Sequence, residues 1–134
     1  VFGNTAGGEG YDLVLLGTNG PTRIDLDRID ARIHAPGAER LRDSLAAIGC
    51  DGAAELFASY AAAGPQLGGW LSDAQINRDA NLRLQYLAGL GVNAYEQAPM
   101  YWAILDAGAW PEGIFTGSPE RLERLEQLGR QARF

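Results

Sequence analysis

Glycine and proline divide the middle of this 134-residue chain into short pieces. Pro36-Gly37, Gly49 and Gly64-Pro65 each follow a stretch in which apolar residues recur every three or four positions. Glycine commonly ends a helix and proline does not continue one, so the pattern predicts short helices within residues 25–35, 38–48 and 51–63. Because the connections between them are very short, we expect the three helices to pack as a small antiparallel cluster.

Aspartate and serine mark the expected starts of several helices. Asp25 and Asp51 are the predicted N-caps of the first and third helices. Near the C-terminus, Ser118 and Pro119 precede a stripe of leucines and predict a further helix. The oppositely charged pairs four residues apart in that helix are Glu120–Arg124 and Glu126–Arg130. Residues 98–107 are also predicted to be helical.

The first twenty residues have a different character. A glycine-rich stretch separates residues 1–3 from the apolar run Leu13–Leu16, which predicts a hairpin whose second strand is buried. A two-stranded hairpin is marginally stable alone, so we expect this one to belong to a larger sheet. The predicted fold class is mainly α with a short N-terminal β-hairpin (residues 1–20), followed by a helical domain (residues 21–134).

The composition excludes several kinds of chemistry. The chain has no lysine, one histidine and one cysteine, so it provides no P-loop lysine, Schiff-base lysine or Cys/His zinc site. We predict no metal site, no cofactor and no catalytic residue. The net charge of −6 argues against nucleic-acid binding. No apolar run approaches the roughly 20 residues that span a bilayer, so no transmembrane segment is predicted.

The polar stretch Asn77–Asn81 is the best candidate for a site. A carboxylate in such a turn accepts backbone N–H bonds and pairs with a guanidinium, so we expect Asp79 to anchor an extended segment at 82–86. Arg78 and Arg83 flank Asp79. In an alternative interpretation, these three residues bind an anionic or amine substrate in a small enzyme.

Two tryptophans are the remaining candidates for a binding surface. Trp70 and Trp102 suit a ligand cleft or a partner surface, although core packing is the commoner role of such residues. His34 and Cys50 lie at predicted helix ends, and we interpret both as structural.

Three blocks of the chain carry a family resemblance. They read YDLVLLG at 11–17, WLSDAQINRDANLRLQYLA at 70–88 and PEGIFTGS at 111–118. In this order they resemble the C-terminal region of bacterial spermidine-synthase-like proteins, the long forms in which an aminopropyltransferase-type domain is fused to membrane-spanning segments. The residues that fit a terminal Asn-Thr-Asp-Asp-x-Pro-x-Leu-Glu-Tyr motif of that family are Asn77, Asp79, Leu84 and Tyr86. Those that depart from it are Arg78, Ala80, Leu82 and Gln85.

The resemblance implies that residues 1–18 are the last hairpin of a methyltransferase-like α/β sheet. The glycine-rich nucleoside loop and catalytic aspartates of the family would then lie upstream, so none of them is carried over onto this chain. The implied function is a structural, lid or assembly portion of a polyamine aminopropyltransferase-type protein, not catalytic alone. It would pack on the upstream domain or on a second copy, and it would be cytoplasmic or the soluble part of a membrane-attached protein. The alternative is a free-standing helical module that binds a protein or a ligand.

Overall fold

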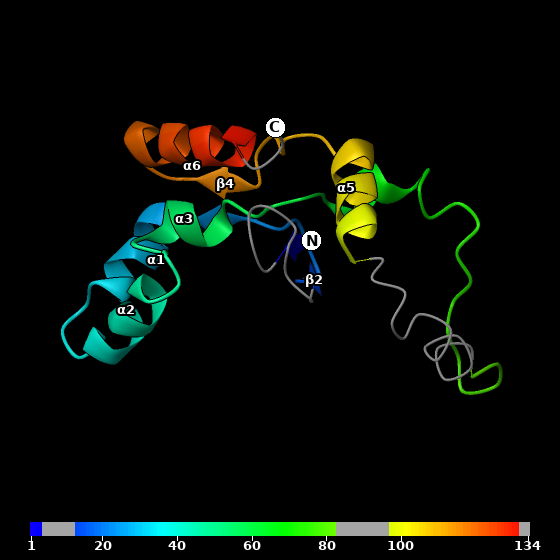
Figure 1. Cartoon of the computed structure of the whole chain (residues 1–134), viewed down its shortest axis with the longest axis horizontal. Helices are drawn as coiled ribbons and strands as arrows, with labels where there is room; N and C mark the ends of the chain where they lie inside the picture. The colour runs from blue at the N-terminus through cyan, green and yellow to red at the C-terminus, as the bar shows by residue number, and fades with distance from the viewer. Residues whose placement is uncertain (4–12, 83–96, 132–134) are drawn as a thin grey trace.

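The computed structural model describes residues 1–3, 13–82 and 97–131, which are mainly helical (Figure 1). The α-helices are α1 (Leu26–Ile33), α2 (Glu39–Ala46), α3 (Ala53–Phe57), α5 (Gln97–Ala107) and α6 (Pro119–Gln131). A 3-10 helix, η1, spans Gly64–Leu67. The strands are β1 (Phe2–Gly3), β2 (Leu13–Val14), β3 (Ile24–Asp25) and β4 (Phe115–Thr116). The predicted fold class, mainly α with a short N-terminal hairpin, is confirmed, whereas its relation to a methyltransferase-like sheet stays a prediction.

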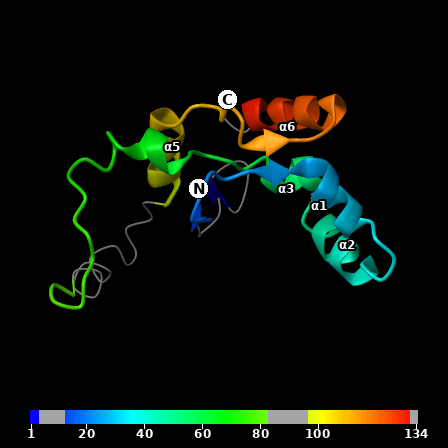
Figure 2. The ribbon, with the colours of Figure 1, turned by 180° about the vertical axis from the view of Figure 1, so that it is seen from behind.

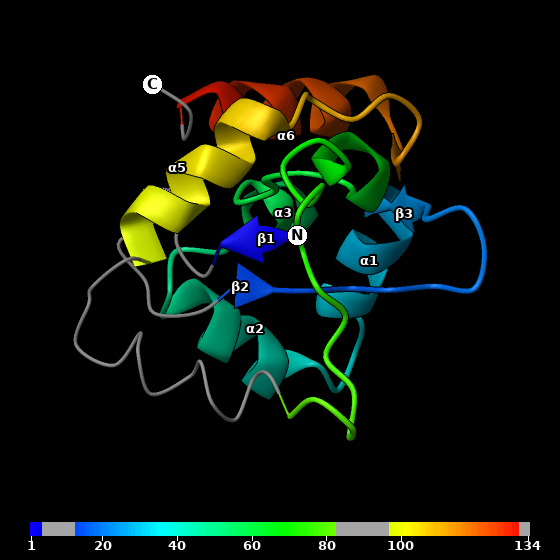
Figure 3. The same cartoon turned by 90° about the vertical axis from the view of Figure 1, so that its right-hand side faces the viewer.

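The hairpin strands β1 and β2 are antiparallel, with Phe2 opposite Val14 (Figure 3). On its other side β1 meets the segment after α3, where the N–H of Gly3 donates to the carbonyl of Ser59 at 3.0 Å. β1 is therefore flanked on both sides, while the outer edge of β2 faces no strand among the described residues. The expectation of a buried strand over Leu13–Leu16 is wrong, because β2 is shorter and Leu15 is 74% exposed.

The second sheet joins distant parts of the chain. β3 and β4 pair in parallel, with Ile24 opposite Phe115 and Asp25 opposite Thr116. β3 leads directly into α1 and β4 precedes α6 by two residues, so the pairing brings the starts of these helices together. Gly117, in the connection to α6, has a φ of +153°, and a Cβ there would lie 3.2 Å from the Cβ of Leu26. The close approach of α1 and α6 favours glycine at this position.

The predicted helices within 25–63 are present, and their ends follow local rules. Asp25 caps α1 by accepting the N–H of Arg28 at 3.0 Å, as predicted. Gly37 and Gly49 follow α1 and α2 with φ values of +87° and +78°, a region that glycine enters without strain. The predicted cap of α3 is wrong, because Gly52 occupies the N-cap position instead of Asp51.

Two apolar clusters form the core of the part that the structure describes. The first contains aromatic rings from β1, β4 and the segment after α3, packed around Leu26 and Leu125. The second packs α5, through Tyr101, Ile104 and Leu105, on residues 61–67. The hairpin contributes to both clusters, and Figure 2 shows it between α5 and the group formed by α1, α3 and α6.

Candidate functional site

The polar turn at Asn77–Asn81, proposed as a site, is exposed and is closed by hydrogen bonds between its own residues and Ile76. The N–H of Arg78 donates to Oδ1 of Asn81 at 2.9 Å, and Nδ2 of Asn81 donates to the carbonyl of Ile76 at 2.9 Å. Within the described part of the chain, the exposed Asp79 side chain forms neither a hydrogen bond nor an ion pair. The backbone hydrogen bonds expected at Asp79 are therefore absent among the described residues, where Asn81 bonds the turn instead. Arg83 and the rest of the expected strand through Tyr86 lie outside the described residues.

The two candidate tryptophans lie on different segments. Trp70, in the turns that follow η1, is 41% exposed, and Trp102, on α5, is 40% exposed. The ring of Trp102 contacts that of Tyr101, with 6.1 Å between the ring centres. Among the described aromatic contacts, none joins Trp70 to Trp102. The two residues therefore stay separate candidates for binding.

An apolar pocket of about 690 Å³ opens beside the hairpin. Its walls come from four parts of the chain: the hairpin, the turn after α2, helix α3 and helix α6. The apolar side chains of the described residues that line it are Phe2, Val14, Leu16, Ile48, Leu56, Phe57, Ala58 and Leu128. Pockets of 300–1,000 Å³ with mostly apolar walls are typical of small-molecule sites. Sequence reasoning missed this one, because its walls come from segments more than 100 residues apart.

The pocket has few polar groups. Oε1 of Glu55 lies 3.0 Å from Nε of Arg124, which compensates the charge of this carboxylate. Cys50 also lines the pocket, and burial together with the nearby carboxylates of Glu55 and Asp51 raises the pKa of its thiol. The predicted pairing of Arg124 with Glu120 on the same helix is wrong, because Arg124 pairs with Glu55 on α3 instead.

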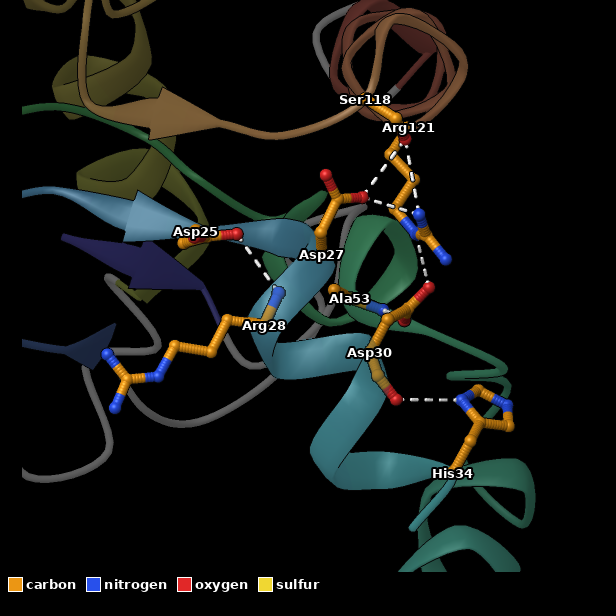
Figure 4. A network of polar contacts seen from close by, with 8 residues as sticks. All are labelled: Asp25, Asp27, Arg28, Asp30, His34, Ala53, Ser118 and Arg121. Carbon is orange, nitrogen blue, oxygen red and sulfur yellow. Dashed lines mark hydrogen bonds and ion pairs between the residues drawn. The ribbon is translucent and has the colours of Figure 1, made fainter.

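A network of charged groups ties α1 to α3 and α6 (Figure 4). Arg121 of α6 donates to Asp27 and Asp30, two carboxylates on one face of α1. Asp27 also accepts the hydroxyl of Ser118 at 3.0 Å, and Asp30 accepts the N–H of Ala53 at 2.7 Å. Thus the carboxylates of α1 accept hydrogen bonds from groups at the starts of two neighbouring helices. The positive end of the helix dipole at each start also favours a negative charge close to it.

These contacts keep both carboxyl groups ionised. Burial by itself would raise the pKa of Asp30, but the N–H of Ala53 and the guanidinium of Arg121 outweigh it and lower that pKa. The pKa of Asp27 is lowered likewise, because hydrogen bonds from Ser118 and Arg121 outweigh its desolvation. An ionised carboxylate paired with a guanidinium is a poor general acid, so the network acts as a clamp between helices.

Comparison of the chain with protein-family models, curated proteins and solved structures finds no match. Within the described ranges, no helix combines the length and apolar character that crossing a bilayer requires. Nor do three or more His, Cys, Asp or Glu side chains of that part converge as a metal site.

Proposed function

We propose that this chain is the C-terminal structural and assembly portion of a spermidine-synthase-like, aminopropyltransferase-type protein, and that it docks through β2. The outer edge of β2 is the observation that carries the proposal. It faces no strand among the described residues, and Leu15 and Leu16 just beyond it are 74% and 58% exposed. Unpaired backbone groups beside exposed leucines favour the addition of a further strand.

The sequence of this edge supports the same conclusion. Exposed edge strands usually carry a charge or a proline that prevents pairing with another strand. Residues 13–20 read Leu-Val-Leu-Leu-Gly-Thr-Asn-Gly and contain neither. An upstream sheet of the same protein is the partner that the family resemblance suggests, and a strand from it would extend the hairpin.

We expect no catalysis of aminopropyl transfer by this portion alone. The most engaged carboxylates, those of Asp27 and Asp30, are held by Arg121 and by neighbouring helices, which suits a structural role. Transfer of an aminopropyl group would require the nucleoside loop and catalytic aspartates that the family carries upstream. The whole gene product should then catalyse this transfer to a diamine, whereas residues 1–134 alone should not.

A two-piece binding experiment tests the docking. The gene is expressed as an upstream piece that ends before Val1 and as the present chain, and the two pieces are mixed and separated by size. We expect them to elute together, and we expect Leu15→Lys to abolish this. Ile76→Lys is the matched control, because Ile76 is 70% exposed but lies far along the chain from β2. Failure to co-elute, or equal loss in both variants, would contradict the proposal.

A further inference from the structure

We infer that the pocket beside the hairpin is a binding site for a small, neutral, apolar molecule. Val14 and Leu16 of the docking segment line this pocket, whereas Leu15, the residue changed to test the docking, does not. The volume of about 690 Å³ is large enough for a molecule of two or three rings or for a folded hydrocarbon chain.

The shape of the pocket follows from how its walls are held. The rings of Phe2 and Phe57 lie 5.6 Å apart and are tilted by 59°, so they form a rigid aromatic wall. Phe2 belongs to the first core cluster, and Phe57 packs against it. The lining also includes Ile48, which is 72% exposed and follows α2. A ligand would cover this isoleucine and remove apolar surface from water, which is the main driving force for binding here.

The polar groups of the pocket define the class of ligand. Among the described residues that line it there is no arginine, and the chain has no lysine, so an anionic head group meets no positive charge from these residues. The carboxylate of Glu55 already has a partner in Arg124, 3.0 Å away. The raised pKa of the Cys50 thiol favours its neutral form, which behaves as a small apolar group. A neutral ligand therefore fits better than a charged one.

Fluorescence titration with N-phenyl-1-naphthylamine, a neutral two-part aromatic probe, tests the site. We expect saturable binding in the micromolar range, and binding of the anionic 8-anilinonaphthalene-1-sulfonate at least tenfold weaker. Ile48→Glu should weaken binding of the neutral probe by tenfold or more. Ile76→Glu, at a residue with nearly the same exposure outside the pocket, should change it less than twofold. Absence of saturation, or the same loss in both variants, would overturn the inference.

Cys50 provides a second measurement that reports on the pocket itself. It is the single cysteine of the chain and lines the pocket, so its alkylation by N-ethylmaleimide is specific to this place. A saturating concentration of the neutral probe should slow this alkylation several-fold at pH 8.5. An unchanged rate with the probe bound would show that the probe lies elsewhere and would overturn the inference.

The same protection measured in the whole gene product separates a small-molecule site from a protein contact. Protection of Cys50 by the probe should persist there. Failure of the probe to bind, with Cys50 already unreactive, would mean that a protein segment fills the pocket and would overturn the inference. That result would leave the docking of β2 intact, which is tested separately by Leu15→Lys.

Discussion

The carboxylate of Asp30 on α1 accepts the backbone N–H of Ala53, the first residue of α3, at 2.7 Å. Asp30 is 23 residues from Ala53 and 91 residues from its other partner, Arg121. One side chain thus satisfies the start of α3 and also links α1 to α6. Its side chain is only 16% exposed, so loss of these contacts would leave partners with little access to water.

Replacement of Asp30 by asparagine should destabilise the fold. Asparagine keeps an acceptor for Ala53 but cannot form the ion pair with Arg121, and we expect the free energy of unfolding to fall by about 1–3 kcal/mol. Urea denaturation followed by circular dichroism measures the loss. Asp43→Asn is the control, because Asp43 is exposed on α2, and it should stay within about 0.5 kcal/mol of the parent. Equal stability of the two variants would mean that the clamp contributes nothing.

Acid should release the same clamp. The pKa values of Asp27 and Asp30 lie below their ordinary value of 3.8 in the folded protein, so the unfolded chain binds more protons as the pH falls. The stabilisation is complete above about pH 5 and is lost as the pH drops through the folded pKa values. Urea midpoints between pH 6 and pH 2 should show this fall.

The guanidinium of Arg121 should account for part of the acid sensitivity. In Arg121→Gln the two carboxyl groups lose their shared ion-pair partner, so the fall in stability between pH 6 and pH 2 should become shallower. Arg130→Gln, on the same helix but paired with Glu126, should leave the slope unchanged. An unchanged slope in Arg121→Gln would contradict the assigned cause of the lowered pKa values.

A methyl group at Gly129 should disturb the packing of α6. Glycine to alanine inside a helix usually stabilises it, but a Cβ at this buried position would overlap the ring of Trp110. We expect Gly129→Ala to cost about 1–3 kcal/mol and to change the tryptophan fluorescence. At Gly69 a Cβ meets nothing within 4 Å, so Gly69→Ala should be nearly neutral. Stabilisation by Gly129→Ala would contradict this packing.

The polar turn at 76–82 gives a prediction that reverses the sequence-based expectation for Asp79. Asp79 is exposed and Asn81 bonds the turn, so Asp79→Ala should change the free energy of unfolding by less than about 0.5 kcal/mol. Asn81→Ala removes the side-chain bonds to the backbone at Arg78 and Ile76, and its effect should be larger. Thermal unfolding of both variants measures the two effects. A larger loss of stability in Asp79→Ala than in Asn81→Ala would mean that Asp79 stabilises this part of the chain.

The sequence predicted features that depend on neighbouring residues. Gly37 and Gly49 marked helix ends, Asp25 marked the start of α1, and Glu126 with Arg130 gave the expected ion pair at 2.6 Å. Each of these features depends only on residues a few positions away along the chain, so it can be predicted from the sequence alone.

Contacts between distant segments were not predictable in the same way. β3 and β4 are two residues long, too short for any alternation of apolar and polar residues to show. The capping of α3 by Asp30 and the pairing of Arg124 with Glu55 depend on how helices pack, and nothing in their local sequence indicates the partner. The pocket likewise exists only after the hairpin, α3 and α6 have come together.

Amide hydrogen exchange at Leu13–Leu16 tests whether the chain docks through β2. The exchange rates are measured in this chain alone and in the whole gene product under the same conditions. We expect fast exchange at Leu15 in the chain alone and exchange at least a hundredfold slower in the whole product, because Leu15 directs its N–H away from β1 and a further strand would bond to it. Equal rates in the two, or a gene product that contains nothing beyond these residues, would contradict it.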